Sequence, residues 1–367
     1  MVKIPSLLDL RAEQTATIDL PFQGHHVITG APGGGKSVMA LYRAWSVATT
    51  GRKVVLLTRS NLLQQYLSQM APELMDSLHV TTFHRWVKKL WGACFRCDPP
   101  SIDEEGWRYD WVEMIRACIV GRVSSNAHLV IDEGQNLPVD FFRLVRSLGM
   151  SATVFADGNQ RIGDDESTLS EICRALGVQS EPLVLQDNHR NSREIVMLAS
   201  EFRKDVLGDV PLPERAGRTP TVRGVPSSEY LVAEVARYFG AHPERSIGII
   251  CRSTRMLLDV QSGLRRLGLA GHTQTYVHDD RHRRTVDFSA RPIHVVTTAS
   301  MKGLEFDSVF VPDLDAYTED PTGVDVRLRL FVLCTRARED LYFAHRGPEE
   351  PAVLSGIPDS LLARHAA

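Results

Sequence analysis

The chain has 367 residues, of which 24% are charged and 43% hydrophobic, and its formal net charge is −3. This length predicts two domains of ordinary size, and the composition excludes a disordered, low-complexity or repeat protein. The small net charge gives no general attraction to nucleic acid, so binding of that kind would need a local groove.

Signals for export or membrane insertion are weak in this sequence. The opening stretch MVKIPSLLDLRAEQ lacks a long apolar segment before a small-residue cleavage site, and no apolar run reaches the length of a membrane span. We therefore expect a cytoplasmic protein with no membrane partner. The six cysteines are scattered, which favours reduced thiols over a disulfide framework.

The first half of the chain alternates β-rich runs with amphipathic segments. Helices are predicted from Lys36 onward and at 61–70, 139–148 and 167–176. Strands are predicted at 25–29, 53–58, 79–83, 128–133 and 152–157. Strands that alternate with helices predict a parallel, doubly wound sheet.

The same alternation resumes in the second half and predicts a second α/β sheet. Strands are expected at 221–225, 246–253, 294–298, 308–314 and 341–345, and helices at 227–239, 256–267 and 327–338. The boundary falls near 185–190, which gives domains 1–187 and 188–367. Two stretches break the alternation, at about 85–127 and 277–291, and each is interpreted as an insertion.

Residues 30–37, GAPGGGKS, match the G-x-x-x-x-G-K-[ST] pattern of a phosphate-binding loop, between a predicted strand and a predicted helix. Glycines let backbone N–H groups face phosphates, Lys36 adds charge at the outer phosphates, and the Ser37 hydroxyl can bind Mg²⁺. We therefore predict that the chain binds and hydrolyses ATP with Mg²⁺. The residues predicted to hold the nucleotide here are Gly30, Ala31, Pro32, Gly33, Gly34, Gly35, Lys36 and Ser37.

An acidic pair, Asp132 and Glu133, follows the apolar run of a later predicted strand. Carboxylates at the end of a parallel strand emerge at the edge of the sheet where ligands bind. Alone, such a pair is an ordinary strand end; together with a phosphate loop, it indicates phosphate chemistry. Asp132 is predicted to hold Mg²⁺ through its shell, and Glu133 to accept the proton of the attacking water.

Taken together, the motifs along 14–343 resemble, in order, those of superfamily 1 helicases of the UvrD/Rep type. The resemblance is carried by Gln14, the phosphate loop, Thr58, Thr82-Phe83-His84, Asp132-Glu133-Gly134-Gln135, Ala156-Asp157-Gly158-Asn159-Gln160, Asn188-His189-Arg190, Thr297 with Lys302-Gly303-Leu304-Glu305, and Thr335-Arg336-Ala337. It implies two RecA-like domains with the ATP site in the cleft between them.

The resemblance also implies roles for single residues. Gln14 would read the adenine, His189 would stack on it, and Glu305 would lie near the ribose. Gln160, Arg190 and Arg336 would reach the γ-phosphate, where a guanidinium can bond two oxygens of the transferring group. Single-stranded nucleic acid, expected to be DNA, would lie in a groove lined by Thr58, Thr82, Phe83, His84 and Lys302.

This sequence departs from the family pattern where the family contacts nucleic acid. No aromatic residue follows Gln160, and Ala299 stands where a histidine is usual. Stacking on aromatics contributes about 1 to 3 kcal/mol per base, so a strand-tracking motor would lose grip. Two functions therefore stay open: a helicase or single-strand translocase, and an ATP-driven switch that acts on a protein partner such as a nuclease.

Three weaker signals have a structural and a functional interpretation. Cys94 and Cys97 have the spacing of half a zinc site, but a closed site needs four ligands. The tryptophans around them either stack on bases or pack a small core, and packing is favoured. The basic run 281–284 either contacts phosphates or forms a solvated loop, and the loop is favoured.

Overall fold

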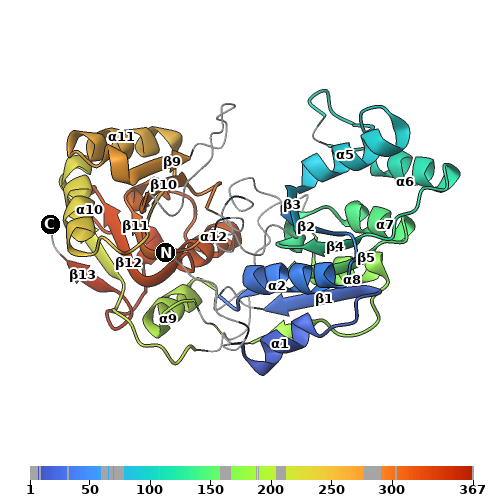
Figure 1. Cartoon of the computed structure of the whole chain (residues 1–367). Coiled ribbons are helices and arrows are strands. Elements are labelled where there is room, and N and C mark those ends of the chain that lie inside the picture. Colours follow the sequence, from blue (N-terminus) through green and yellow to red (C-terminus); the bar gives the residue numbers. More distant parts are fainter. Residues whose placement is uncertain are drawn as a thin grey trace. The chain divides into compact units, whose positions relative to one another are not determined.

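The computed structural model describes residues 7, 10–30, 33–58, 65, 69, 78–106, 108–157, 167–186, 188, 190–203, 212–276, 291–301 and 304–365. The chain divides into two compact units, Val2–Gln186 and Asp187–Ala367, called here the N-terminal and C-terminal units (Figure 1). Each unit is built around its own sheet, and the two are described separately.

The N-terminal unit contains a six-stranded sheet in the order β3-β2-β4-β5-β1-β6, in which every pairing is parallel. Its strands are β1 (His25–Gly30), β2 (Val54–Thr58), β3 (His79–Thr82), β4 (His128–Ile131), β5 (Ser151–Ala156) and β6 (Leu183–Leu185). Its helices are α1 (Ala12–Ile18), α2 (Lys36–Thr49), α5 (Phe83–Phe95), α6 (Trp111–Val120), the 3-10 turn η2 (Gly134–Asn136), α7 (Val139–Ser147) and α8 (Leu169–Leu176).

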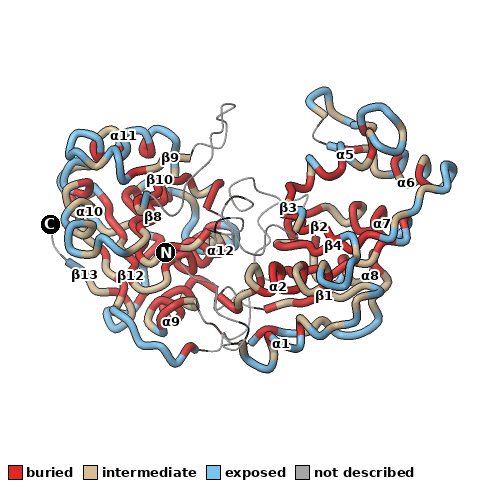
Figure 2. Tube along the Cα trace, in the orientation of Figure 1, coloured by how far each residue is buried: buried red, intermediate tan, exposed pale blue. Residues whose placement is uncertain are grey.

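The central strands of this sheet are buried on both faces, as continuous apolar runs in a parallel sheet require. Every residue of β2 and of β4 is buried. Because side chains alternate along a strand, one face packs against α2 and the other against α5 to α8. Figure 2 shows the buried residues gathered in the strands and in the inner sides of these helices.

The C-terminal unit contains a seven-stranded sheet in the order β13-β7-β12-β11-β8-β10-β9, again with parallel pairings throughout. Its strands are β7 (Thr221–Gly224), β8 (Ile247–Cys251), β9 (Thr273–Tyr276), β10 (Ile293–Thr297), β11 (Phe306–Val311), β12 (Ala337–His345) and β13 (Ala363–His365). Its helices are α9 (Arg193–Glu201), α10 (Ser228–Ala241), α11 (Thr254–Arg266) and α12 (Val324–Cys334), with 3-10 turns η3 (Ala270–His272), η4 (Leu314–Ala316) and η5 (Ala352–Leu354).

One predicted element of this unit has wrong bounds. The helix expected at 327–338 is α12, which ends at Cys334, and Ala337 already pairs with Phe306 as the first residue of β12. After Ala337 the strand continues with Arg338, Glu339 and Asp340, and this polar stretch hid its start from the hydrophobic pattern. The predicted helix at 61–70 lies outside the described residues, apart from Gln65 and Gln69.

The predicted fold class is confirmed: both halves are α/β units with parallel sheets, an arrangement consistent with two RecA-like domains. The short strands β6 and β13 were not predicted, since three residues carry little periodicity. Most of the second insertion, 277–290, lies outside the described residues. In the part of the chain that the structure describes, no helix is long and apolar enough to cross a membrane.

Candidate functional site

The carboxyl ends of the N-terminal strands meet at one edge of the sheet, because all the strands run in parallel. This edge carries the last residues of three strands, Thr82 of β3, Thr58 of β2 and Gly30 of β1, and the residues that follow two others, Asp132 after β4 and Asp157 after β5. The described residues predicted for phosphate chemistry therefore lie at the ends of β4 and β1, with Asp157 after β5 between them. Those predicted for nucleic acid lie on the neighbouring strands β2 and β3, where Thr58 and Thr82 are in register.

The phosphate loop has the backbone conformation that its glycines allow. Gly33 and Gly35 have φ values of 90° and 80°, in the left-handed region that other residues rarely adopt. Helix α2 begins directly afterwards at Lys36, so its unpaired N–H groups face the loop. The amide nitrogen of Gln14 lies 3.1 Å from where a Cβ on Gly35 would be, which places Gln14 against the loop.

Lys36 has internal partners in this structure. Its ammonium group donates to the Gly30 carbonyl at 2.6 Å and lies 3.4 Å from a carboxylate oxygen of Asp157. Both side chains are buried, with Lys36 8% exposed and Asp157 1%. The charge of Lys36 is therefore held at the loop. If phosphate bound there, its oxygens would replace part of the contacts that Lys36 makes with Gly30 and Asp157.

Asp132 is a buried carboxylate with one oxygen to spare. Its Oδ1 accepts from the Glu133 N–H at 3.1 Å, whereas Oδ2 is buried without a hydrogen-bond donor among the described residues. Burial and the nearby Glu133 raise the pKa of Asp132 to about 7, against the opposite effects of Ser37 and Lys36. An orphaned carboxylate oxygen beside a serine and a phosphate loop fits a hydrated Mg²⁺, which supplies the missing positive charge and donors.

Glu133 stands out by its backbone. It has φ 56° and ψ 44°, a left-handed conformation that costs a residue with a side chain about 1 to 3 kcal/mol. Its carboxylate Oε2 accepts from the side-chain amide of Gln135 at 2.6 Å. The turn η2 that follows therefore fixes the position of both the backbone and the carboxylate of Glu133.

The residues predicted to line a nucleic-acid groove differ in how accessible they are. The Thr58 hydroxyl is buried without a partner among the described residues, and Thr82 is 7% exposed. Phe83 is 4% exposed, and its ring packs edge-on against Phe141. His84 shares a hydrogen bond with the Tyr109 hydroxyl at 3.2 Å. The Phe83 ring is thus used by the core of the unit.

The candidate residues of the C-terminal unit also engage one another. The Arg190 guanidinium forms a close ion pair with the Glu305 carboxylate, and both are mostly buried. Burial alone would raise the pKa of Glu305, but Arg190, Arg338 and Arg336 together lower it. The carboxylate is therefore held ionised by a cluster of arginines.

Arg336 is one of the largest fully buried side chains of the unit, 1% exposed. Its guanidinium donates to the Val332 carbonyl at 3.0 Å, the Leu304 carbonyl at 3.2 Å and the Thr335 hydroxyl at 3.3 Å. These bonds join the end of α12 to the segment before β11. Arg336 and Glu305 precede β12 and β11, so they lie at the amino edge of this sheet.

Several predicted site residues lie outside the described residues, so the structure places none of them: Ala31, Pro32, Gln160, His189 and Lys302. Two further residues join the site although they were not among the predicted site residues. Asp157 pairs with Lys36, and Gln135 contacts Glu133. Asp157 directly follows β5 and Gln135 lies in the turn η2 after β4, but their contacts depend on the neighbouring positions of β4, β5 and β1.

The weaker signals have structural roles where they are described. Trp86 and Trp91 are buried in the core cluster of the N-terminal unit. All six cysteines are free, and the described residues contain no group of three or more histidine, cysteine or acidic side chains able to hold a metal ion. The basic run 281–284 lies outside the described residues.

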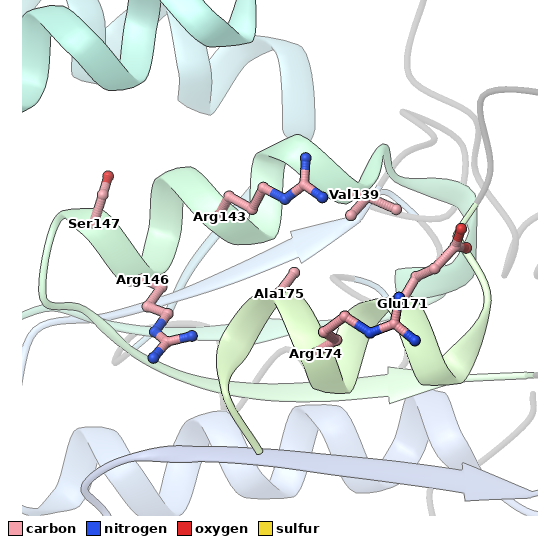
Figure 3. Close-up of a pocket in the computed structure, with 7 residues that line it drawn as sticks. All are labelled: Val139, Arg143, Arg146, Ser147, Glu171, Arg174 and Ala175. Atoms are coloured by element: carbon pink, nitrogen blue, oxygen red, sulfur yellow. The ribbon is translucent and has the colours of Figure 1, made fainter. Parts of the chain in front are cut away.

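A surface pocket of about 610 Å³ lies between α7 and α8, apart from the residues above. Figure 3 shows Arg143 and Arg146 on one of its walls and Arg174 on the other. Arg143 forms an ion pair with Asp140 at 2.5 Å. None of the predicted site residues lines this pocket, so it is not the candidate site.

Comparisons with known proteins add little to this picture. No protein-family model and no curated protein sequence matches the chain. Among solved structures, the chain is similar to the C-terminal domain of a possible DNA helicase from Lactobacillus plantarum WCFS1, at 22% identity and a TM-score of 0.37. The match covers 48% of this chain and 97% of that domain. A likeness at this level carries no argument about what the chain does.

Proposed function

We propose that the chain is a Mg²⁺-dependent ATPase. One arrangement at the carboxyl edge of the N-terminal sheet carries the proposal. There, the glycine loop with its left-handed backbone conformation and Lys36 lie beside the acidic pair that follows β4. The Asp132 carboxylate supports it, because its buried Oδ2 has no hydrogen-bond partner among the described residues and would be stabilised by a cation or water.

Each residue then has a defined task in hydrolysis. Backbone N–H groups of the loop and the Lys36 ammonium bind the phosphates. To do so, Lys36 gives up part of its contacts to Asp157 and Gly30 and bonds to phosphate oxygens instead. Glu133 accepts a proton from water as the water oxygen bonds to the γ-phosphorus and the bond to the β-phosphate oxygen breaks. Mg²⁺, held by Ser37 and through the shell of Asp132, would neutralise charge on the phosphate oxygens.

We further propose that hydrolysis drives movement along single-stranded nucleic acid, most readily DNA, as in a helicase or translocase. The ordered motif series supports this, as does the position of Thr58 at the end of β2, which pairs with β4, and of Thr82 beside it at the end of β3. The roles that the resemblance gives to Arg190 and Arg336 require each guanidinium to exchange its present partners for phosphate oxygens.

One observation favours a second candidate, an ATP-driven switch that acts on a protein partner such as a nuclease. The Phe83 ring packs in the core beside Phe141 and is 4% exposed, so it is not presented to a base. Together with the missing aromatic after Gln160, this weakens the contacts that a strand-tracking motor needs.

Steady-state ATP hydrolysis by the full chain tests these proposals, measured with Mg²⁺ alone and with single-stranded DNA or RNA added. We expect turnover by the wild type and none by Lys36→Ala, which should also lose nucleotide binding. Equal rates in the wild type and Lys36→Ala would overturn the ATPase assignment. With an active ATPase, stimulation by a single strand supports the motor, and its absence with both polymers supports the switch.

A further inference from the structure

Gln135, which follows the acidic pair, has both ends of its side chain occupied and is 1% exposed. Its amide nitrogen donates to Glu133 Oε2 at 2.6 Å, and its amide oxygen accepts from the backbone N–H of Asp157 at 2.9 Å. Its own carbonyl accepts from the Ser167 N–H at 2.9 Å. The residue is therefore fixed in both its backbone and its side chain.

The chemistry of its two partners settles which way the amide points. A backbone N–H can only donate, and an ionised carboxylate can only accept. The oxygen of Gln135 must therefore face Asp157 and its NH₂ group must face Glu133. No other arrangement of this amide satisfies both neighbours, so the contact to Glu133 is specific to a glutamine at this position.

We infer that Gln135 is a positioning residue for hydrolysis, which holds the Glu133 carboxylate for proton transfer. The inference rests on the proposed ATPase function and on the role of Glu133 in it. Gln135 takes its own position from Asp157, whose carboxylate pairs with Lys36. The group that accepts the proton and the group that binds the outer phosphates are thus placed from the same strand end, that of β5.

A purely structural role is the competing explanation, since a buried glutamine with two hydrogen bonds also stabilises the loop. Two variants separate the explanations. Gln135→Glu keeps the oxygen that accepts from Asp157, loses the donor to Glu133 and places a second negative charge beside it. Gln135→Met keeps the approximate volume and loses both bonds. Gln179→Glu, at an exposed glutamine of the same unit, is the matched control.

The experiment measures kcat for ATP, nucleotide affinity and thermal unfolding for each variant, in the wild-type and the Glu133→Gln backgrounds. We expect kcat to fall about 10- to 100-fold in Gln135→Glu, as for a lost hydrogen bond to a charged group, with nucleotide affinity changed less than about threefold. In the Glu133→Gln background, single-turnover rates should show no further loss, because Gln135 acts only through the carboxylate.

The inference is overturned by wild-type kcat in both Gln135 variants, or by an equal further loss in the Glu133→Gln background. Unfolding of Gln135→Met with normal kcat in Gln135→Glu would also assign the residue to structure alone. A wild type without ATP turnover is a separate outcome, because it removes the proposed function before Gln135 is tested. Gln179→Glu should match the wild type throughout.

Discussion

The candidate residues of the two units differ in how completely they are bonded within the protein. At the carboxyl edge of the N-terminal sheet, Lys36 is bonded to Gly30 and Asp157, and Asp132 Oδ2 is buried without a donor among the described residues. In the C-terminal unit, Arg190 is paired with Glu305, and Arg336 is bonded to carbonyl groups of its own unit. The two arginines are therefore bonded or paired within their own unit, whereas one oxygen of Asp132 is not.

Residues that match motifs of the same helicase family can therefore differ in how much they must rearrange before they contact a phosphate. A glycine loop that already has its left-handed backbone conformation needs little backbone rearrangement to bind phosphates, although Lys36 must exchange part of its internal contacts. A buried guanidinium that already satisfies its donors must lose those bonds before it reaches a phosphate, and the gain is reduced by that loss. Binding of nucleotide is therefore expected to depend mainly on the N-terminal unit.

The largest expected effect is on turnover in Glu133→Gln. The amide keeps the size of the side chain but cannot accept a proton, so kcat should fall about 10²- to 10⁴-fold while nucleotide binding is kept. Steady-state hydrolysis and equilibrium binding of ATP measure the two quantities. Glu181→Gln, an exposed control in the same unit, should behave as the wild type. Undiminished turnover would remove Glu133 from the mechanism.

The second effect concerns the stability of the C-terminal unit. Arg336→Lys cannot reproduce the three bonds of the guanidinium and leaves buried carbonyl groups without donors. We expect the free energy of unfolding to fall by about 2 to 4 kcal/mol, measured in urea. Arg255→Lys, at an exposed arginine of α11, should cost little. Normal stability with reduced turnover would show that Arg336 is not held as described.

A third prediction concerns the effect of Asp313 on the pH dependence of the free energy of unfolding. Asp313 follows β11 at the carboxyl edge of the C-terminal sheet. Burial raises the pKa of Asp313 to about 6 from 3.8, although the Arg252 N–H opposes the shift. Its contribution to stability is therefore complete below about pH 4 and lost as the pH rises through 6. Relative to Asp313→Asn, the wild type should lose up to about 3 kcal/mol between pH 4 and 7. Thermal unfolding at a series of pH values measures this. The same change of stability with pH in the wild type and in Asp313→Asn would contradict the prediction.

The smallest effect concerns packing behind the acidic pair. A Cβ on Gly134 would lie 2.4 Å from a methyl carbon of Val154, so Gly134→Ala should lower the free energy of unfolding by about 1 to 3 kcal/mol. A Cβ on Gly92 in α5 would meet nothing within 4 Å, and Gly92→Ala should instead stabilise by about 0.5 to 1 kcal/mol. Equal effects of the two changes, measured by thermal unfolding, would show that the turn is not tightly packed.

The sequence was sufficient to predict the two sheets, the phosphate loop and the strand ends that carry Asp132 and Asp157. These features depend on local pattern: alternation, glycines before a helix, and acids after an apolar run. The contacts of Gln135 could not be predicted in this way, because they require β5 to lie beside β4. The burial of Arg336 could not be predicted from the sequence for the same reason, because one of its partners is the carbonyl of Leu304, 32 residues away.

The order of the strand ends has a consequence for communication along the sheet. The Asp132 N–H bonds to the Leu57 carbonyl at 2.9 Å, and Leu57 immediately precedes Thr58. Under the proposed function, nucleic acid would bind at Thr58, at the end of β2. Only one backbone hydrogen bond separates this end from Asp132, which would face the metal ion. A displacement of the end of β2 would then reach Asp132 through this backbone hydrogen bond, with no side chain in between.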